Sequence, residues 1–231
     1  FAPTEQQKKI LIGEGIPGKY IHVVGNTVVD AVKENLEISK KLTGAKSTST
    51  KMLKDLKIKP KKYFIVTAHR EENVDKKNVL ETIIKTISHL QKEYKADAVF
   101  PLHPRTRKRI EEFRIKLPPK IKVIEPIGYL EMLPLMQNAL FILTDSGGIQ
   151  EEACTLQIPC ITMRESTERP ESIEVGANIM VGTDLNRILE GARKMLKTKG
   201  KKPWKNPFGK GDTAEKIVKI LIAEKPHNKK S

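Results

Sequence analysis

The chain has 231 residues, which is long enough for one large domain or two small ones with a substantial core. Its 38% hydrophobic content is ordinary for a soluble globular protein once glycine is added, and no apolar stretch approaches the roughly 18 residues that a membrane span requires. The net charge of +15 would suit a nucleic-acid-binding module, but the lysines are spread along the chain and follow no known recognition motif. We therefore expect neither a membrane nor a nucleic acid as partner.

The amino terminus and the cysteines indicate the cellular context. Phe1 is not an initiator methionine and no signal peptide follows it, so we expect a fragment of a longer polypeptide. Cys154 and Cys160 lack both the CxxC spacing and the companion histidines of a metal site. We interpret them as small core residues of a reduced, cytoplasmic protein, and we expect no metal or other cofactor.

The first sixty residues contain two predicted helices and a polar segment. Residues 4–7, Thr-Glu-Gln-Gln, indicate a capping box that opens a short helix ending near Gly13. Tyr20–Val24 is a strand candidate, and an amphipathic helix is expected over about Thr27–Leu42. Residues 43–60 are polar and lysine-rich, which is typical of a flexible connection.

From residue 61 onward, strand-type and helix-type segments alternate. Strands are predicted at Tyr63–Thr67, Ala98–Leu102, Lys122–Ile124, Leu140–Thr144, Cys160–Met163 and Asn178–Val181. Helices are predicted at Asn78–Tyr94, Arg105–Ile115, Leu130–Asn138, Leu185–Leu196 and Thr213–Ala223. Apolar strands joined by helices form parallel sheets that are covered on both faces. The predicted fold class is therefore α/β, a Rossmann-like parallel sheet with helices on both faces, whose ligands gather beyond the carboxyl ends of the strands.

The segment after the predicted strand Leu140–Thr144 is the most informative part of the chain. Ser146, Gly147 and Gly148 come just before a helix-forming sequence, and the free N–H groups at a helix start attract an anion, most often phosphate. Glycine lets the backbone come close to such a ligand. Glu152 stands four residues past Gly148 on the same helix face, at a reach that suits ribose hydroxyls. This pattern predicts a nucleotide diphosphate site; the alternative is a tight turn that needs glycine only for packing.

Two further charged segments follow predicted strands and are expected at the same rim. His69 and Arg70 would neutralise charge that grows on a leaving diphosphate, unless they form only a solvent-exposed turn. The loop 164–171 is rich in groups that bind phosphate or sugar hydroxyls, with Arg169 best placed because Pro170 restricts the backbone before it. The alternative for this loop is a surface turn held by internal ion pairs.

A third basic segment, residues 103–107, follows the predicted strand Ala98–Leu102. Its sequence is His-Pro-Arg-Thr-Arg, which is compatible with an anion site. An ordinary basic first turn of a helix is the favoured interpretation.

Four motifs together resemble the non-hydrolysing UDP-N-acetylglucosamine 2-epimerase family. They are His-Arg-Glu-Glu-Asn at 69–73, Asp-Ser-Gly-Gly-Ile-Gln-Glu-Glu-Ala at 145–153, the loop 164–171, and Asn-Pro-Phe-Gly-Lys-Gly-Asp at 206–212. Their order and spacing fit the family, and the similarity extends over most of the chain apart from residues 43–60. The resemblance implies the carboxyl-terminal, nucleotide-binding half of a two-domain architecture like that of the glycosyltransferase-B class.

The resemblance also divides the chain into parts. Residues 1–42 would be an entry helix, strand and helix that lead from a missing amino-terminal domain. Residues 43–60 would be the flexible connection, and residues 61–231 would form the Rossmann-like UDP-binding domain with a carboxyl-terminal helix.

Residue roles follow from the same resemblance. His69 would be catalytic and would assist the departure of UDP. The implied substrate-binding residues are Arg70, Ile127, Met132, Ser146, Gly147, Gly148, Glu152 and Arg169. Among them, the serine and glycines would hold the diphosphate, Glu152 the ribose, and Arg169 the nucleotide, while uracil would lie near residues 127–132.

The implied reaction interconverts UDP-N-acetylglucosamine and UDP-N-acetylmannosamine by elimination and re-addition of UDP. A base takes the proton from sugar C2 while the C1–O bond breaks, so one or two carboxylates are needed as acid and base. We expect these carboxylates in the missing amino-terminal domain, and a homodimer for the full-length protein. The alternatives are a glycosyltransferase of the same architecture and, from a different class, a basic nucleic-acid-binding module.

Overall fold

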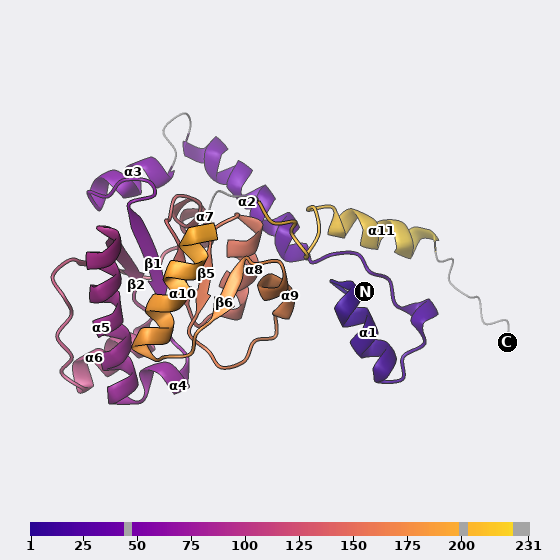
Figure 1. Ribbon diagram of the computed structural model, residues 1–231. Coiled ribbons are helices and arrows are strands. Elements are labelled where there is room, and N and C mark those ends of the chain that lie inside the picture. The colour runs from indigo at the N-terminus through magenta and orange to yellow at the C-terminus, as the bar shows by residue number, and fades with distance from the viewer. Residues whose placement is uncertain (44–47, 199–202, 224–231) are drawn as a thin grey trace.

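The computed structural model describes residues 1–43, 48–198 and 203–223 (Figure 1). Its centre is a six-stranded sheet with the order β3-β2-β1-β4-β5-β6, and all neighbouring strands run parallel. The strands are β1 Tyr63–Thr67, β2 Asp97–Pro101, β3 Ile121–Ile124, β4 Ile142–Thr144, β5 Cys160–Thr162 and β6 Asn178–Met180. The predicted α/β fold with a Rossmann-like parallel sheet is confirmed.

The strands are apolar on both faces, which is why the sheet needs helices on both sides. In β1, Phe64 and Val66 contribute to one core and Tyr63 and Ile65 to the other, because successive side chains of a strand point to opposite faces. All four side chains are fully buried. The hydroxyl of Tyr63 is satisfied within the second core by donating to the carbonyl oxygen of Leu135 at 2.5 Å.

Helices cover the two faces as separate groups (Figure 1). On the first core lie α5 (Lys77–Tyr94), α6 (Pro104–Glu112) and α10 (Leu185–Thr198). On the second core lie α3 (Thr48–Asp55), α7 (Tyr129–Gln137) and α8 (Gly147–Thr155), and α2 (Thr27–Thr43) packs across α7 and α8. The short helices α4 (Glu71–Val74) and α9 (Pro170–Glu174) begin within segments that the sequence predicts as rim loops.

The segment 206–212 joins the last helix, α11 (Thr213–Ala223), to α2. Phe208 is buried in a small core with residues of α2 and α8, and its carbonyl oxygen accepts from the N–H of Asn26 at 2.7 Å. Gly25 has a φ of +98°, and a β-carbon there would lie 2.7 Å from the Thr213 hydroxyl. Glycine is therefore required for this close approach, and the motif 206–212 has a structural role. α1 (Glu5–Gly13) and α11 lie to the side of the sheet layers in Figure 1.

One predicted strand is wrong. Tyr20–Val24 does not join the sheet: Gly18–Tyr20 forms the short 3-10 helix η1, and Val23 makes only an isolated bridge with Ala2. The reason lies in the tertiary structure: among the described residues, Ala2 alone forms a bridge with this segment, so no ladder of strand hydrogen bonds develops. The expected helix before it is confirmed, and Thr4 caps α1 by accepting from the N–H of Gln7.

Part of the expected connection 43–60 is helical. Residues 44–47 lie outside the described residues, but α3 follows them, and Leu53 and Ile58 are buried in the second core. The lysine-rich composition concealed a narrow apolar face that packs on α7.

The remaining predicted helices and strands agree with the structure to within a few residues. Cys154 and Cys160 are buried and unbridged, as expected of core residues. In the described part of the chain, no helix combines the length and apolar character that crossing a membrane demands.

Candidate functional site

The candidate site lies where the order of the strands reverses, between β1 and β4. In open parallel sheets, ligands bind beyond the carboxyl ends of the strands at such a switch point. Thr67 and Thr144, the last residues of these two strands, share a hydrogen bond of 2.6 Å between their hydroxyls. The segments that follow, with His69 and Ser146, therefore meet at one rim.

Asp145 follows β4 and organises this rim. Its side chain is fully buried, and Oδ2 accepts from the backbone N–H groups of His69 and Arg70 at 2.9 Å each and from Asn73 Nδ2 at 3.1 Å. Oδ1 lies 3.1 Å from Nδ1 of His69, and Arg70 Nε donates to the Asp145 carbonyl oxygen at 2.9 Å. One buried carboxylate thus fixes both basic residues. A plain solvent-exposed turn, the alternative for this segment, does not account for that arrangement.

The same contacts shift the protonation of the pair. The hydrogen bond to Asp145 raises the pKa of His69 above its usual value, against the opposing effects of burial and of the Arg70 charge. Burial alone would raise the pKa of Asp145, but hydrogen bonds from His69 and from the Arg70 backbone outweigh it, and the pKa falls below its ordinary range. The pair therefore favours an imidazolium at the rim, which is suited to a negatively charged group.

Helix α8 begins at this rim with an open first turn. Ser146 is its N-cap residue and makes no side-chain cap, and helical positions begin at Gly147. A β-carbon at Gly148 would meet no atom within 4 Å, and one at Gly147 would meet only Glu168 Oε2, at 3.8 Å. Packing therefore does not require either glycine, which argues against the packing-only alternative. The space in front of the first amides is what a phosphate needs to reach them.

Glu152 lies half-buried one turn further along α8. Burial raises its pKa, and a hydrogen bond with the hydroxyl of Tyr129 acts in the opposite direction. Tyr129 opens α7, and its neighbours Ile127 and Met132 pack partly buried on the second core. The structure therefore brings Glu152, the residue predicted to bind the ribose, next to the segment 127–132 that is predicted to lie near uracil.

Arg169 is held on α8 by a different glutamate. Its Nε forms an ion pair with Glu151 Oε1, and the same oxygen accepts from Asn26 Nδ2 at 2.9 Å. Burial raises the pKa of Glu151, while the Arg169 charge and the Asn26 hydrogen bond oppose that change. Arg169 and Glu151 line a pocket of about 370 Å³ together with Asn26, Phe208 and Ile10 of α1. The arginine is therefore positioned rather than free.

Other ion pairs hold the loop 164–171. Arg164 donates to both carboxylate oxygens of Glu168, each at 2.9 Å, and Arg187 pairs with Glu165 at 3.1 Å. This feature agrees with the alternative of a turn held by ion pairs. However, the Arg164 side chain is only 7% exposed, so this loop reaches into the site and is not merely superficial.

The basic segment 103–107 is neutralised by neighbouring acids. Arg105 makes a two-pronged contact with Asp75, at 3.1 and 2.5 Å, and Arg107 lies 2.6 Å from Glu125. His103 caps α6 by accepting from the N–H of Arg105. These contacts support its interpretation as the basic first turn of a helix.

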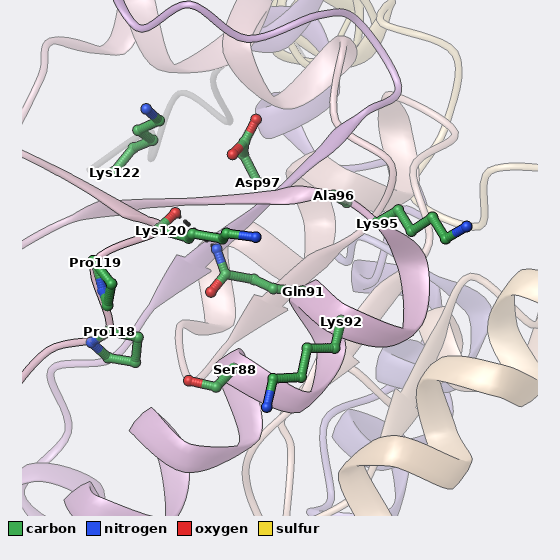
Figure 2. Close-up of a pocket in the computed structure, with 10 residues that line it drawn as sticks. All are labelled: Ser88, Gln91, Lys92, Lys95, Ala96, Asp97, Pro118, Pro119, Lys120 and Lys122. Atoms are coloured by element: carbon green, nitrogen blue, oxygen red, sulfur yellow. Dashed lines mark hydrogen bonds between the residues drawn. The ribbon is translucent and has the colours of Figure 1, made fainter.

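A larger depression, of about 660 Å³, lies near the amino ends of strands β2 and β3, away from the carboxyl ends where the candidate site lies (Figure 2). It is bordered by the end of α5, the start of β2 and the segment before β3, and its charged residues are Lys92, Lys95, Asp97, Lys120 and Lys122. Figure 2 shows the four ammonium groups reaching in different directions. They do not converge on one point, as groups that bind a diphosphate must.

Sequence reasoning missed Asp145, Asn73, Tyr129 and Glu151 as members of the site. An aspartate directly after an apolar strand was a usable signal for the first, because a carboxylate there must find donors at the rim. The others depend on contacts between distant segments. In the parts of the chain that the structure describes, no group of three or more His, Cys, Asp or Glu residues is placed to hold a metal ion.

Comparisons with known proteins agree with this geometry. The family profile described as UDP-N-acetylglucosamine 2-epimerase matches residues 1–222. The chain is 48% identical to the UDP-N-acetylglucosamine 2-epimerase of Methanocaldococcus jannaschii, with 96% of this chain and 60% of that protein covered. It is 44% identical to the enzyme of that name from Methanococcus maripaludis, over 97% of this chain and 61% of the relative. The chain thus spans about 60% of the length of these curated relatives.

Solved structures give the same result. The Methanocaldococcus jannaschii UDP-GlcNAc 2-epimerase in complex with UDP-GlcNAc and UDP matches with a TM-score of 0.84 at 47% identity, covering 96% of this chain and 60% of that one. The Neisseria meningitidis enzyme bound to UDP-GlcNAc matches with a TM-score of 0.77 at 34% identity, covering 97% of this chain and 61% of that one. With the profile match over nearly all of its length, the chain belongs to the UDP-N-acetylglucosamine 2-epimerase family.

Proposed function

We propose that the chain binds the UDP moiety of UDP-N-acetylglucosamine and supplies the nucleotide-binding part of an enzyme that interconverts this sugar nucleotide with UDP-N-acetylmannosamine. The observation that carries the proposal is the open start of α8 at the switch point, beside the buried Asp145 and its partner His69. Membership of the family supports it, as do the solved relatives that hold UDP-GlcNAc and UDP.

The diphosphate is the part of the ligand for which the geometry is most specific. The amides of Gly147 and Gly148 and the dipole of α8 favour a negative charge at Ser146. The imidazolium of His69, oriented by Asp145, stabilises the charge that develops on UDP as the C1–O bond breaks. Arg70, held by the Asp145 carbonyl oxygen, adds a second fixed positive charge.

The nucleoside occupies the adjoining part of the rim in this proposal. Glu152 accepts hydrogen bonds from the ribose hydroxyls, and uracil lies against Ile127 and Met132. Arg169 contacts the nucleotide in the orientation that Glu151 imposes. These roles follow the arrangement of the side chains and the family to which the chain belongs.

The proton chemistry is proposed to come from elsewhere in the protein. Elimination requires a base for the C2 proton and an acid for its return. We place these carboxylates in the part of the relatives' length that this chain does not span. The chain by itself then binds and releases UDP without turnover. We further propose that the full-length enzyme is a cytoplasmic homodimer.

Calorimetric titration of the chain with UDP tests the proposal. Wild-type protein should bind UDP, and Glu152→Ala should raise the dissociation constant about tenfold or more, because hydrogen bonds to a charged acceptor are lost. Glu190→Ala, an exposed glutamate on α10, is the matched control and should bind as the wild type does. Absence of heat with millimolar UDP contradicts the proposal, and unchanged affinity in Glu152→Ala removes that residue from the site.

Two experiments separate the alternative functions. With the full-length protein and no acceptor, formation of UDP-N-acetylmannosamine from UDP-N-acetylglucosamine indicates the epimerase, whereas a strict need for an acceptor indicates a glycosyltransferase. A nucleic-acid-binding module would bind polynucleotide with a steep dependence on salt and would ignore free UDP.

A further inference from the structure

The carboxylate of Glu168 lies at the start of α8, where the proposed function requires a phosphate. Its Oε2 is 3.8 Å from the position that a β-carbon would take at Gly147. The hydrogen bond from Arg164, followed by a backbone hydrogen bond and by the charges of Arg164 and Arg70, lowers the pKa of Glu168 to about 2. A carboxylate therefore lies close to Gly147, in the first turn of a helix whose amino terminus favours an anion.

Arg164 is the second part of this arrangement. Its guanidinium makes a bidentate contact with Glu168, with both N–O distances at 2.9 Å, and its side chain is only 7% exposed. Glu168 itself is 59% exposed. Asp145 and Glu72 also lie close enough to stabilise the arginine charge. Such a buried, two-pronged donor matches a phosphate as well as it matches a carboxylate.

The backbone around Glu168 is fixed, but its side chain is not enclosed. Thr167 donates to Gln150 Oε1 at 2.7 Å, and the same oxygen accepts from Asn178 at 3.0 Å. The N–H of Arg169 donates to the Thr167 hydroxyl at 3.1 Å. The loop is therefore tied to α8 on either side of Glu168, by Thr167 before it and by the ion pair of Arg169 with Glu151 after it. A rotation of the exposed side chain moves the carboxylate away from α8 without moving the loop.

We propose that Glu168 is an internal competitor of the diphosphate: its carboxylate competes with the ligand for the start of α8 and for Arg164. On binding, the diphosphate displaces the carboxylate into solvent and takes over the guanidinium. This inference rests on the proposed function. It assigns Arg164 as a phosphate ligand and Glu168 as the residue that lowers the affinity, which helps UDP to leave or to be re-added within the site.

The inference predicts that removing the charge of Glu168 tightens binding. Glu168→Gln retains the size of the side chain but competes poorly for a guanidinium. The dissociation constant for UDP should therefore fall about three- to fivefold, the upper part of the range for exposed ion pairs, because Arg164 is itself buried. Glu165→Gln in the same loop is the matched control, since its exposed ion pair with Arg187 involves no group of the site. It removes the same charge and should leave UDP affinity within about twofold.

The ligand series locates the effect. Titration of wild type, Glu168→Gln and Glu165→Gln with UDP and with uridine should show tighter UDP binding by Glu168→Gln only, and equal affinities of all three for uridine, which has no phosphate. Thermal unfolding of each variant measures whether the fold is retained. Arg164→Gln should weaken UDP binding, because it removes the group that the ligand takes over.

The outcomes are distinct for the two proposals. If wild-type protein does not bind UDP, the proposed function is wrong and this inference falls with it. If wild type binds UDP but Glu168→Gln binds it equally or more weakly, the competitor role is wrong and the proposed function stands. The competitor role is also wrong if Glu168→Gln binds uridine more tightly by a similar factor, or if Glu165→Gln binds UDP more tightly by a similar factor. Neither effect involves competition for a phosphate position.

Discussion

The carboxyl ends of the strands (the carboxyl edge) and their amino ends (the amino edge) both carry positive charge, but the charged side chains are held differently at the two. At the carboxyl edge, a buried aspartate binds the backbone of His69 and Arg70, and carboxylates on α8 and in the loop 164–171 orient two more arginines. At the amino edge, lysines surround a wider depression, and their ammonium groups diverge (Figure 2). The larger hollow is therefore not the better site. What distinguishes the carboxyl edge is that its positively charged groups are fixed before a ligand arrives, so that little entropy is lost on binding.

The largest effect on this comparison is expected from Asp145→Asn. An amide cannot accept all the hydrogen bonds that converge on Asp145, and it removes the charge opposite His69, so we expect the free energy of unfolding to fall by about 2–4 kcal/mol. UDP binding should weaken as well, because the residues 69–73 lose their anchor. Denaturant unfolding and UDP titration measure the two effects.

The amino edge offers the control for that variant. Asp97→Asn changes the same functional group at the start of the neighbouring strand β2, where the side chain borders the wider depression. We expect a change in stability within about 0.5 kcal/mol and no change in UDP affinity. Equal losses of stability and of UDP affinity in both variants would contradict the proposed role of Asp145 in fixing the side chains at the carboxyl edge.

An intermediate effect is expected from Gly148→Ala. A methyl group there meets no protein atom within 4 Å, so the melting temperature should stay the same or rise slightly, as for glycine replaced by alanine in a helix. The methyl group would nevertheless occupy the approach to the first amides, and UDP affinity should fall about tenfold or more. Gly13→Ala, also with open space around it but at the end of α1, is the control. Full UDP affinity in Gly148→Ala would place the diphosphate elsewhere.

The smallest effect is expected from His69 and depends on pH. Because the folded-state pKa of His69 is raised, its charge and its stabilisation of the pair with Asp145 are fully present below the unfolded pKa and are lost as pH rises through the folded value. The pKa of Asp145 is lowered, so its carboxylate contributes to stability above the unfolded pKa, and that contribution is lost as pH falls through the folded-state pKa. UDP-N-acetylglucosamine, whose phosphates do not titrate near neutrality, should therefore bind about three- to tenfold more weakly on the alkaline side of the His69 transition.

Two variants isolate that transition. In His69→Gln the pH dependence should disappear, leaving the weaker, alkaline-side affinity throughout. Lys122→Gln removes a positive charge at the amino edge and should retain the dependence unchanged, because charges a sheet length away are screened by solvent and salt. A retained transition in His69→Gln would assign the titration to another group.

Local patterns were enough to predict the layered fold and the helix start on which the proposed binding site depends. Alternating apolar strands and amphipathic helices predicted the parallel sheet, and the sequence Ser146-Gly147-Gly148 after a strand predicted the open helix start, since both depend on residues that are close in sequence. Tyr20–Val24 has the composition of a strand and still lacks a place in the sheet, because strand formation needs a neighbouring strand to pair with.

The sequence by itself determined which elements form and which chemical groups stand at their ends; the tertiary structure decided how those groups are combined. Asp145 meets His69 and Arg70 across more than seventy residues of chain, Arg169 is bound by Glu151 rather than left free, and Glu168 comes to lie at the start of α8. Hydrogen bonds and ion pairs between distant segments depend on the packing of the whole sheet. The periodicity of the sequence, which reflects only local structure, does not predict these contacts.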